Sequence, residues 1–135
     1  MRPRVFDSWA IFAFLLEEPA ARQVESALGD CQDSGRPALI SVINLGEVWY
    51  QIARKTSAER ADRTTARLLE AGLKSEPVDW ELARAAAVFK AKYRLSFADC
   101  CAAALAIRHR AELLTGDPEF RQLEKELKIR WLRPK

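Results

Sequence analysis

Short apolar runs alternate with longer helical segments along this chain, and this alternation constrains the fold more than any other feature. Residues 4–6, 38–43, 113–115 and 129–132 are apolar or β-branched runs of strand length, and residues 76–78 form a further short edge strand. Strands that alternate with helices favour a mostly parallel sheet with helices on both faces. We therefore predict an α/β fold, a three-layer α/β/α sandwich with a mostly parallel central sheet.

The predicted helices lie between these strands. Their boundaries follow from periodicity and from end signals: Gly29 and Gly72 as stops, and Asn44, Asp79, Ser96 and Asp117 as N-caps, with Pro118 at a first helical position. The segments are 8–16, 20–29, 45–52, 58–71, 80–93, 97–110 and one that begins at 118. Residues 31–37 are predicted to be a loop. The segment 97–110 is rich in Ala and Cys and suits close burial.

Composition indicates one folded domain over residues 1–135. Hydrophobic residues make up 49% of the chain, and there are only 5 Gly and 6 Pro, which excludes disorder and low-complexity linkers. The 22 Lys and Arg exceed the 19 Asp and Glu by three. A net charge of +3 lacks the strong basic bias that would itself indicate a nucleic-acid partner.

The cysteines and the N-terminus predict a soluble cytoplasmic protein. Cys31, Cys100 and Cys101 are odd in number and two are adjacent, which matches neither a disulfide framework nor a zinc-ligand spacing. The apolar run 9–16 is too short to cross a bilayer, which needs roughly 20 residues. Acidic residues on both sides of this run also argue against a secretory signal. We expect reduced thiols and no membrane association.

Several reaction classes are excluded by missing residues. Neither GxxxxGK[ST] nor GxGxxG occurs, so phosphate-loop nucleotide binding is not expected. His109 is the only histidine, and RNA cleavage that uses two histidines is therefore impossible. Its position at the end of a predicted helix is typical of a solvated side chain. Chemistry based on carboxylates remains.

Four acidic residues are predicted to meet at one end of the sheet. Asp7 and Asp117 follow strands, while Asp99 and Glu47 lie in the first turns of helices. Ligands of open α/β sheets bind at the carboxyl ends of the strands. Clustered carboxylates suit Mg²⁺ or Mn²⁺, hard cations that prefer oxygen ligands. This arrangement indicates metal-assisted hydrolysis of phosphodiesters.

Each acid also has a purely structural interpretation. Asp117 before Pro118 is an ordinary N-cap, and Asp99 lies three residues after Ser96, where a capping interaction and the helix dipole are worth roughly 0.3–1 kcal/mol. Glu47 could be solvated. Asp7 is the least suited to a surface role, because it interrupts an apolar stretch and its burial without a partner would be costly.

Two other functional classes are alternatives. A receiver-like Mg²⁺-binding regulatory module needs two adjacent acids after the first strand and an Asp after a central one. Here Asp7 stands alone and no Asp follows residues 38–43. A non-catalytic binding domain is disfavoured because all four acids are present.

Four strings follow one another along the chain: residues 5–8 (VFDS), 41–48 (SVINLGEV), 95–99 (LSFAD) and 113–120 (LLTGDPEF). In this order and spacing they resemble the PIN-domain family, and more closely the VapC-type ribonuclease toxins of bacterial type II toxin-antitoxin systems. The resemblance covers almost the whole chain, although residues 55–94 match only in helical character. It implies a PIN-like α/β/α fold and a Mg²⁺- or Mn²⁺-dependent endoribonuclease, a hydrolase of RNA phosphodiester bonds.

The resemblance also implies roles for individual residues. Its catalytic and metal-binding acids would be Asp7, Asp99 and Asp117 as direct ligands, with Glu47 binding the metal through water or positioning the nucleophile. Thr115, Ser8 and Asn44 would orient these carboxylates through hydrogen bonds. Trp9 is bulkier than the small residue common at this position in such proteins, which would change the local shape of the site.

Positive charge near the acids would hold the RNA. Without the four acids the chain has 22 basic and 15 acidic residues, a balance of +7. The candidate RNA rim is the segment 84–110, whose basic residues are Arg84, Lys90, Lys92, Arg94, Arg108 and Arg110, against one acid. A second basic cluster lies in residues 54–74. A solvated helix face is the alternative for both.

The family resemblance further implies partners. It predicts a homodimer and a small cognate antitoxin whose C-terminal segment lies over the acidic pocket. Trp49 and Tyr50, beside Glu47, are candidate exposed aromatic contacts. A PIN-like RNA-processing nuclease outside a toxin system is the alternative function.

Overall fold

A five-stranded parallel sheet forms the centre of the molecule. The computed structural model describes residues 2–133. The strands are β1 (Arg4–Phe6), β2 (Ala38–Ser41), β3 (Leu73–Glu76), β4 (Glu112–Thr115) and β5 (Ile129–Trp131). Their order is β3-β2-β1-β4-β5, and every neighbouring pair is parallel. Val5 of the central strand is in register with Leu39 and Leu113. The predicted parallel sheet is confirmed.

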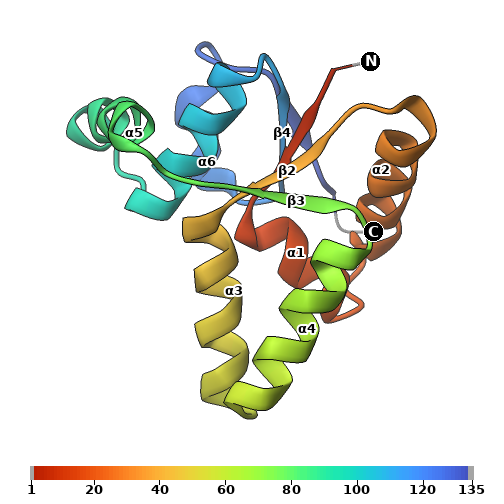
Figure 1. The fold of residues 1–135 in the computed structure, drawn as a ribbon. Coiled ribbons are helices and arrows are strands. Elements are labelled where there is room, and N and C mark those ends of the chain that lie inside the picture. The colour runs from red at the N-terminus through yellow and green to blue at the C-terminus, as the bar shows by residue number, and fades with distance from the viewer. Residues whose placement is uncertain (1, 134–135) are drawn as a thin grey trace.

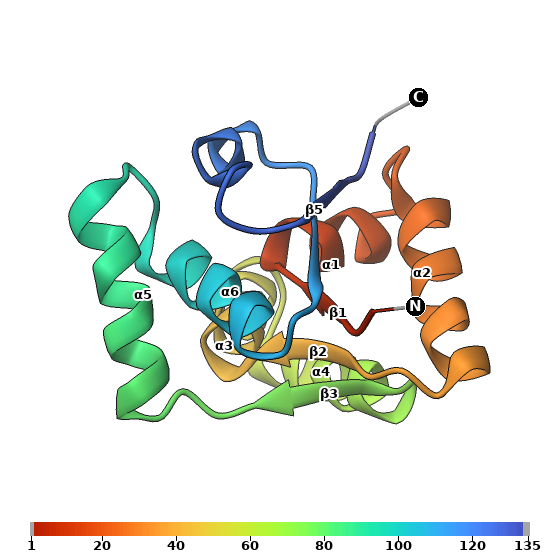
Figure 2. The ribbon, with the colours of Figure 1, turned by 90° about the horizontal axis from the view of Figure 1, so that it is seen from above.

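Helices cover both faces of this sheet, as predicted. They are α1 (Ser8–Leu15), α2 (Ala21–Ser34), α3 (Val42–Lys55), α4 (Ala58–Glu70), α5 (Trp80–Lys92), α6 (Phe97–Arg108) and the 3₁₀ helix η1 (Pro118–Leu123). The side chains of α5, α6 and η1 share one hydrophobic core with Val5, while α1 and α2 share the other with Phe6. Figure 2 shows α5 and α6 on one side of the strands and α1 and α2 on the other. The result is an α/β/α sandwich.

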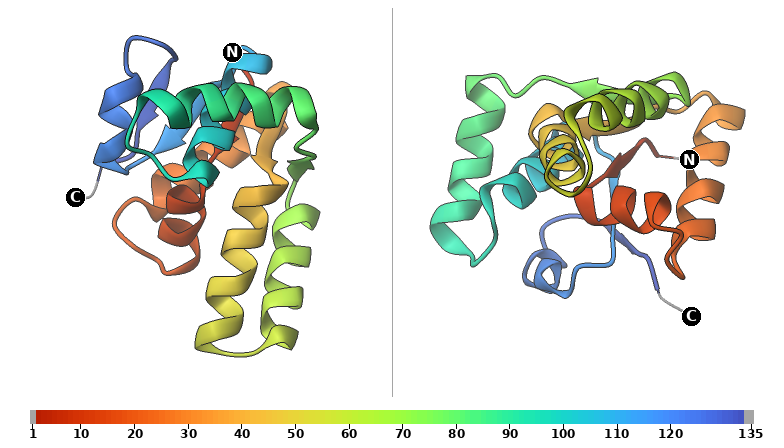
Figure 3. Two further views of the ribbon diagram at one scale, coloured as in Figure 1. Left: turned by 90° about the vertical axis from the view of Figure 1, so that its left-hand side faces the viewer. Right: turned by 90° about the horizontal axis from the view of Figure 1, so that it is seen from below.

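The helical hairpin formed by α3 and α4 projects away from the sheet (Figures 1 and 3). Ser57 ends the short connection and caps α4, because its hydroxyl accepts a hydrogen bond from the Arg60 amide. The Trp49 indole Nε1 donates to Asp62 across the hairpin at 2.9 Å. The base of α3 therefore stays at the sheet, while its far end and α4 present basic side chains away from it.

Helix α6 lies against the sheet because its side chains are small. Residues 100–106 are all buried, and they are Ala and Cys except for Leu105. Burial raises the pKa of the Cys100 thiol to about 11. Cys31, Cys100 and Cys101 are all free and buried, in agreement with the expectation of unpaired thiols.

Several predicted boundaries are wrong, each for a local reason. Helix α2 continues past Gly29 through the predicted loop and ends at Gly35, whose φ of 73° is the left-handed conformation that favours glycine. Strand β2 ends at Ser41, and Ser41 rather than Asn44 caps α3. The third strand is β3 rather than residues 76–78, because residues 73–76 pair with β2. The last helix is the 3₁₀ helix η1.

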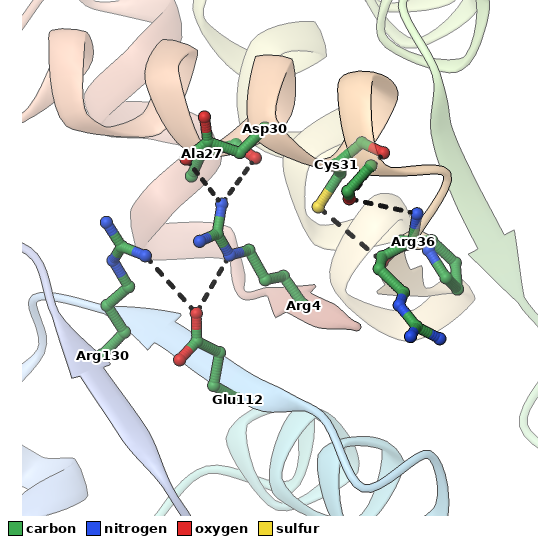
Figure 4. Close-up of polar contacts among 9 residues, drawn as sticks. Arg4, Ala27, Asp30, Cys31, Arg36, Glu112 and Arg130 are labelled. Atoms are coloured by element: carbon green, nitrogen blue, oxygen red, sulfur yellow. Dashed lines mark hydrogen bonds and ion pairs between the residues drawn. The ribbon is translucent and has the colours of Figure 1, made fainter. Parts of the chain in front are cut away.

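A buried arginine network ties the elements together at the amino ends of the strands (Figure 4). Arg4 is only 4% exposed and donates to the Ala27 carbonyl at 2.9 Å, Asp30 at 3.3 Å and Glu112 at 2.9 Å. Arg130 of β5 also contacts Glu112 at 3.5 Å. Burial lowers the pKa of Arg4, but the hydrogen bonds to both acids outweigh it. This charged network therefore lies at the opposite end of the strands from the acidic residues that follow β1 and β4.

Within residues 2–133, no helix has the length and apolarity that a membrane span would need.

Candidate metal centre

The carboxyl edge of the sheet gathers acidic side chains from four elements. Asp7 follows the central strand β1, and Asp117 lies two residues beyond the adjacent strand β4. Asp99 lies in the first turn of α6. Glu47 lies in the second turn of α3 rather than the first, because the helix begins at Val42. Carboxylate oxygens of Asp99, Asp117 and Glu119 lie within 4.8 Å of one another.

Asp7 is buried at the centre of this edge. Its side chain is 1% exposed, and its Oδ1 accepts a hydrogen bond from the Ala10 amide at 2.8 Å. Its Oδ2 has no hydrogen-bond partner among the residues that the structure describes. A buried carboxylate oxygen without a partner is costly. The orphaned oxygen is therefore the point in the site that most requires a cation or a proton.

Burial raises the pKa of Asp7 to about 7, and the negative charges of Asp99 and Asp117 contribute to this rise. The hydrogen bond from the Ala10 amide opposes it, as does the nearby Thr115 hydroxyl, which does not form a hydrogen bond of normal geometry with Oδ2. Burial likewise raises the pKa of Asp99 to about 6, with further contributions from Asp117, Glu47 and Glu119. These mutual effects are those of like charges that share a site. The acids thus act on one another electrostatically, and a divalent cation would relieve their repulsion.

Helix capping at Ser96 and Asp117 coexists with this cluster. The Ser96 hydroxyl accepts a hydrogen bond from the Asp99 amide at 3.1 Å and caps α6. Asp117 Oδ1 accepts from the Glu119 amide at 3.0 Å and caps η1. The capping interaction of Asp117 uses Oδ1 and leaves Oδ2 available to bind a ligand. Structural and functional interpretations of these acids are therefore compatible.

Glu119 is a member of the cluster that sequence reasoning missed. It is exposed and lies two residues after Asp117, where the turn of η1 brings its carboxylate to Asp99 and Asp117. The available signal was its place directly after Pro118 at the start of the predicted helix. Nothing in its spacing from a strand distinguished it from a solvated first-turn acid.

A chain of buried polar groups holds Glu47. The Ser41 hydroxyl donates to Asn44 Oδ1 at 2.7 Å, and Asn44 Nδ2 donates to Ser8 Oγ at 3.1 Å. The Ser8 hydroxyl in turn donates to Glu47 Oε1. Ser8, Ser41 and Asn44 are all buried. Ser8 and Asn44 thus lie where they can orient Glu47, and Ser41 completes the chain.

Thr115 belongs to the other side of the site. It is fully buried at the end of β4, and its Oγ1 accepts a hydrogen bond from the Asp117 amide at 3.1 Å. Its hydroxyl also lowers the pKa of Asp7. Thr115 therefore acts on two of the predicted metal ligands, Asp117 through its backbone amide and Asp7 through the pKa of its carboxyl.

Trp9 is accommodated by a glycine. A Cβ atom at Gly116 would lie well inside van der Waals distance of the Trp9 ring. The indole therefore packs on the bare backbone between β4 and Asp117. The large residue after Ser8 shapes the site by this contact, and it requires glycine before Asp117.

The basic residues of the candidate RNA rim do not all lie near the acids. Lys90 and Lys92 lie in the last turn of α5 and Arg94 in the connection to α6, where Lys90 Nζ donates to the Leu95 carbonyl at 2.7 Å. Arg84 is exposed in the middle of α5. Arg108 lies nine residues beyond Asp99 in α6, or about 14 Å along the helix axis.

The far end of α6 is thus separate from the acid cluster. There Arg108 forms an ion pair with Asp79 at 2.9 Å, and His109 contacts Glu76 at 3.3 Å. Arg110 lies in the turn that follows. The structure does not bring Arg108 and Arg110 together with the acids, because Arg108 ends α6 and Arg110 follows it, whereas Asp99 lies in the first turn of this helix.

Comparison with known proteins agrees with this architecture. The DNA-bound VapBC of Salmonella typhimurium matches with a TM-score of 0.76 and 18% identity over 98% of this chain and 100% of that chain. VapBC2 of Rickettsia felis matches with a TM-score of 0.74 and 14% identity over 96% of this chain and 98% of that chain. VapC20 of Mycobacterium tuberculosis, a sarcin-ricin loop cleaving toxin, matches with a TM-score of 0.68 and 18% identity over 88% of this chain and 93% of that chain.

At these identities the shared feature is the fold. No curated protein sequence matches the chain. The PIN domain model, however, matches residues 4–126, from the first strand through η1. Because this match spans most of the sequence and includes every acid of the cluster, the chain belongs to the PIN domain family of nucleases.

Proposed function

We propose that this protein is a Mg²⁺- or Mn²⁺-dependent endoribonuclease that acts as the toxin of a toxin-antitoxin pair. The observation that carries the proposal is the buried Asp7 carboxylate, whose Oδ2 has no partner among residues 2–133 and which lies among other acids. Oxygen atoms in such a set match the ligand preference of these cations. The residues present therefore fit a divalent metal. Asp99, Asp117 and Glu119 already have carboxylate oxygens within 4.8 Å of one another, whereas Asp7 and Glu47 lie outside that group.

Asp7, Asp99 and Asp117 would hold the cation directly, and Glu47 would do so through water. When bound, such a cation supplies Lewis acidity toward a phosphodiester and offsets the charge that develops in its transition state. Asp7 must be ionised to bind it. Since the pKa of Asp7 is about 7, metal binding releases a proton at neutral pH.

Glu47 is suited to the proton chemistry of hydrolysis. The Ser8 hydroxyl holds Glu47 Oε1, so Oε2 remains to accept a proton from the attacking water. Asn44 fixes the Ser8 hydroxyl oxygen by its own hydrogen bond at 3.1 Å. Because a general base must lie within hydrogen-bond reach of its proton, Ser8 and Asn44 act as positioning residues for Glu47.

An apolar cavity supports the presence of a protein partner. It has a volume of about 390 Å³ and lies between α1 and the α3/α4 hairpin, with Phe12, Leu15, Leu16 and Ile52 in its wall. Leu16 is 58% exposed. Exposed apolar patches of this kind favour protein interaction sites. The Salmonella and Rickettsia proteins with this fold are VapBC complexes.

We therefore propose a small antitoxin as the partner, with its C-terminal segment over the acid cluster and the toxin as a homodimer. Tyr50, next to this region on α3, is 43% exposed and stacks with Arg54 at 5.0 Å. Trp49 is half-buried and hydrogen-bonded to Asp62. Tyr50 is accordingly the more available of the two aromatic contacts.

Cleavage of single-stranded RNA by the purified protein tests the nuclease. We expect cleavage with Mn²⁺, loss of cleavage with a chelator, and a decrease of at least about 100-fold in Asp99→Asn, the scale for removing one electrostatic group from an active site. Asp33→Asn, a change of an exposed acid on α2, is the matched control. Unchanged cleavage in folded Asp99→Asn would overturn the proposed site.

Growth of a bacterial host tests the toxin role separately. Induction should arrest growth, and co-expression of the neighbouring open reading frame should relieve the arrest. Mapping of cleavage ends in total RNA after brief induction then identifies the target. Metal-dependent cleavage without growth arrest would instead indicate an RNA-processing nuclease outside a toxin system.

A further inference from the structure

A cavity of about 590 Å³ opens beside Asp117 and is separate from the acid cluster. Its wall includes Gly116, Pro118, Arg121, Glu124, Trp131 and Arg133. The volume lies within the range of about 300–1,000 Å³ that is typical of small-ligand clefts. Gly116 and Pro118 are the two neighbours of Asp117 in the chain. The wall of the cavity is therefore joined to the candidate metal centre by the chain on either side of Asp117, although no acid of the cluster lines the cavity.

The side chains in this wall have the chemistry that binds a nucleotide. Arg121 and Arg133 form no ion pair among residues 2–133. Trp131 Nε1 donates to Glu124 at 2.9 Å, which engages the one acid of the wall and holds the indole ring. Unpaired guanidinium groups bind phosphate, and aromatic rings stack on unpaired bases.

The wall is held in place by contacts with the rest of the fold. The Arg133 amide donates to Gln23 Oε1 at 3.2 Å, and its carbonyl accepts from Gln23 Nε2 at 2.5 Å. The Leu132 amide donates to the Thr115 carbonyl at 2.8 Å. Arg121 lies in η1, which Asp117 caps. These contacts hold the backbone of Arg121 and Arg133 in place relative to Asp117.

Other cavities lack this combination. The hollow of about 290 Å³ on α4 has three guanidinium groups, from Arg60, Arg63 and Arg67, but lies on the projecting hairpin. The hollow of about 720 Å³ after α1 contains Glu17, Glu18 and other charged residues, with acids in excess, and would repel phosphate. Proximity to the acids and the sign of the charge both favour the cavity beside Asp117.

We infer that this cavity is a nucleotide subsite, which binds one nucleotide of single-stranded RNA next to the phosphodiester at the acid cluster. Arg121 and Arg133 bind its phosphate, and the Trp131 ring stacks on its base. The inference rests on the proposed function for the identity of the polymer. It adds a binding position, outside the acid cluster, that none of the four quoted sequence strings predicts.

The test measures binding without cleavage. A fluorescently labelled single-stranded oligoribonucleotide is titrated with the full chain in excess chelator, and anisotropy reports the dissociation constant. We expect Arg121→Gln/Arg133→Gln to bind at least 10-fold more weakly, with the dependence of log K on log salt reduced by about 0.7, the contribution of the one phosphate contact that the two arginines share. Thermal unfolding verifies that the variants fold.

A charge-matched double variant is the control. Arg2 is exposed near the N-terminus, and Arg130 pairs with Glu112 instead of lining the cavity. Arg2→Gln/Arg130→Gln should bind within about 2-fold of wild type. Trp131→Phe keeps a ring and should lose part of the tryptophan fluorescence quenching that the oligonucleotide causes in the wild-type protein.

The outcomes separate this inference from the proposed function. If Arg121→Gln/Arg133→Gln binds as tightly as wild type, or no more weakly than the control, the subsite is refuted, as it is if the wild-type protein does not bind the oligonucleotide. Arginine-dependent binding without Mn²⁺-dependent cleavage refutes the nuclease and retains the subsite. Mn²⁺-dependent cleavage together with binding that does not depend on these arginines refutes the subsite and retains the nuclease.

Discussion

Replacement of Asp7 by Asn should stabilise the metal-free protein while abolishing its activity. The wild-type carboxyl is buried and has one oxygen without a partner among the described residues. Asn is similar in shape and neutral, and its Oδ1 can still accept the hydrogen bond from the Ala10 amide that caps α1. The substitution therefore removes a buried charge without removing the cap.

The size of the effect follows from the pKa. Burial raises the pKa of Asp7 from 3.8 to about 7, so between these values the folded protein binds more protons than the unfolded chain. Stability contributed by the protonated group is present below pH 4 and is lost as the pH rises toward 7. At about 1.36 kcal/mol per pKa unit, the loss reaches up to about 4 kcal/mol above pH 7.

Urea unfolding in chelator at pH 5 and pH 8 measures this loss. The free energy of unfolding of Asp7→Asn minus that of wild type should grow by about 3 kcal/mol between the two pH values, since about two pKa units are crossed. The titration of other groups is common to both proteins and largely cancels. Asp33→Asn, on the exposed side of α2, should show no such growth.

A difference that stays constant from pH 5 to pH 8 would refute the reasoning, because it would mean that Asp7 titrates normally in the folded protein. A uniform destabilisation by Asp7→Asn would show that the carboxylate is held by a partner. Added Mn²⁺ should reverse the order of stability, because it binds the wild-type carboxylate.

The remaining predictions concern the metal, the packing, the positioning of Glu47 and the partner. Mn²⁺ at 100 times its dissociation constant should stabilise wild type by about 2.7 kcal/mol in thermal unfolding, and Asp99→Asn should lose most of this shift. Gly116→Ala should cost about 1–3 kcal/mol by overpacking against Trp9, and the cost should largely disappear in a Trp9→Leu background. Ser8→Ala should lower kcat by about 10–100-fold with little change in KM, whereas Ser34→Ala should not; equal kcat values would exclude the positioning of Glu47 by Ser8. Leu16→Glu should weaken pull-down of the co-expressed antitoxin, and Val88→Glu, on α5, should not; loss in neither variant would place the partner elsewhere.

The sequence specified most of the fold because its signals are local. Alternation of apolar runs and helical segments predicted the parallel sheet and the helical layers, and Asp79, Ser96 and Asp117 cap helices as expected. The errors also have local causes. Gly29 has no space constraint around it, so the helix passes through it and ends where Gly35 supplies the left-handed conformation.

The candidate site was predictable to the extent that it depends on strand ends. Asp7 and Asp117 follow adjacent parallel strands, and adjacency in a parallel sheet brings their side chains to one edge. Glu119 and Ser41 were missed because each looks like an ordinary helix-start residue. Arg121 directly follows the string 113–120 and Arg133 lies 12 residues further on, but neither belongs to a motif that would mark it.

The sequence alone determined the fold class, the edge of the sheet where the acids meet and the exclusion of histidine and phosphate-loop chemistry, because these follow from residue types and periodicity. The tertiary structure decided which charges act together. It buried Asp7 with an oxygen that has no partner among the described residues, took Arg108 and Arg110 to the far end of α6, and brought Arg121 and Arg133 into the wall of one cavity with the two chain neighbours of Asp117. Burial and distance set the strength of electrostatic interactions, and both are properties of the packed chain.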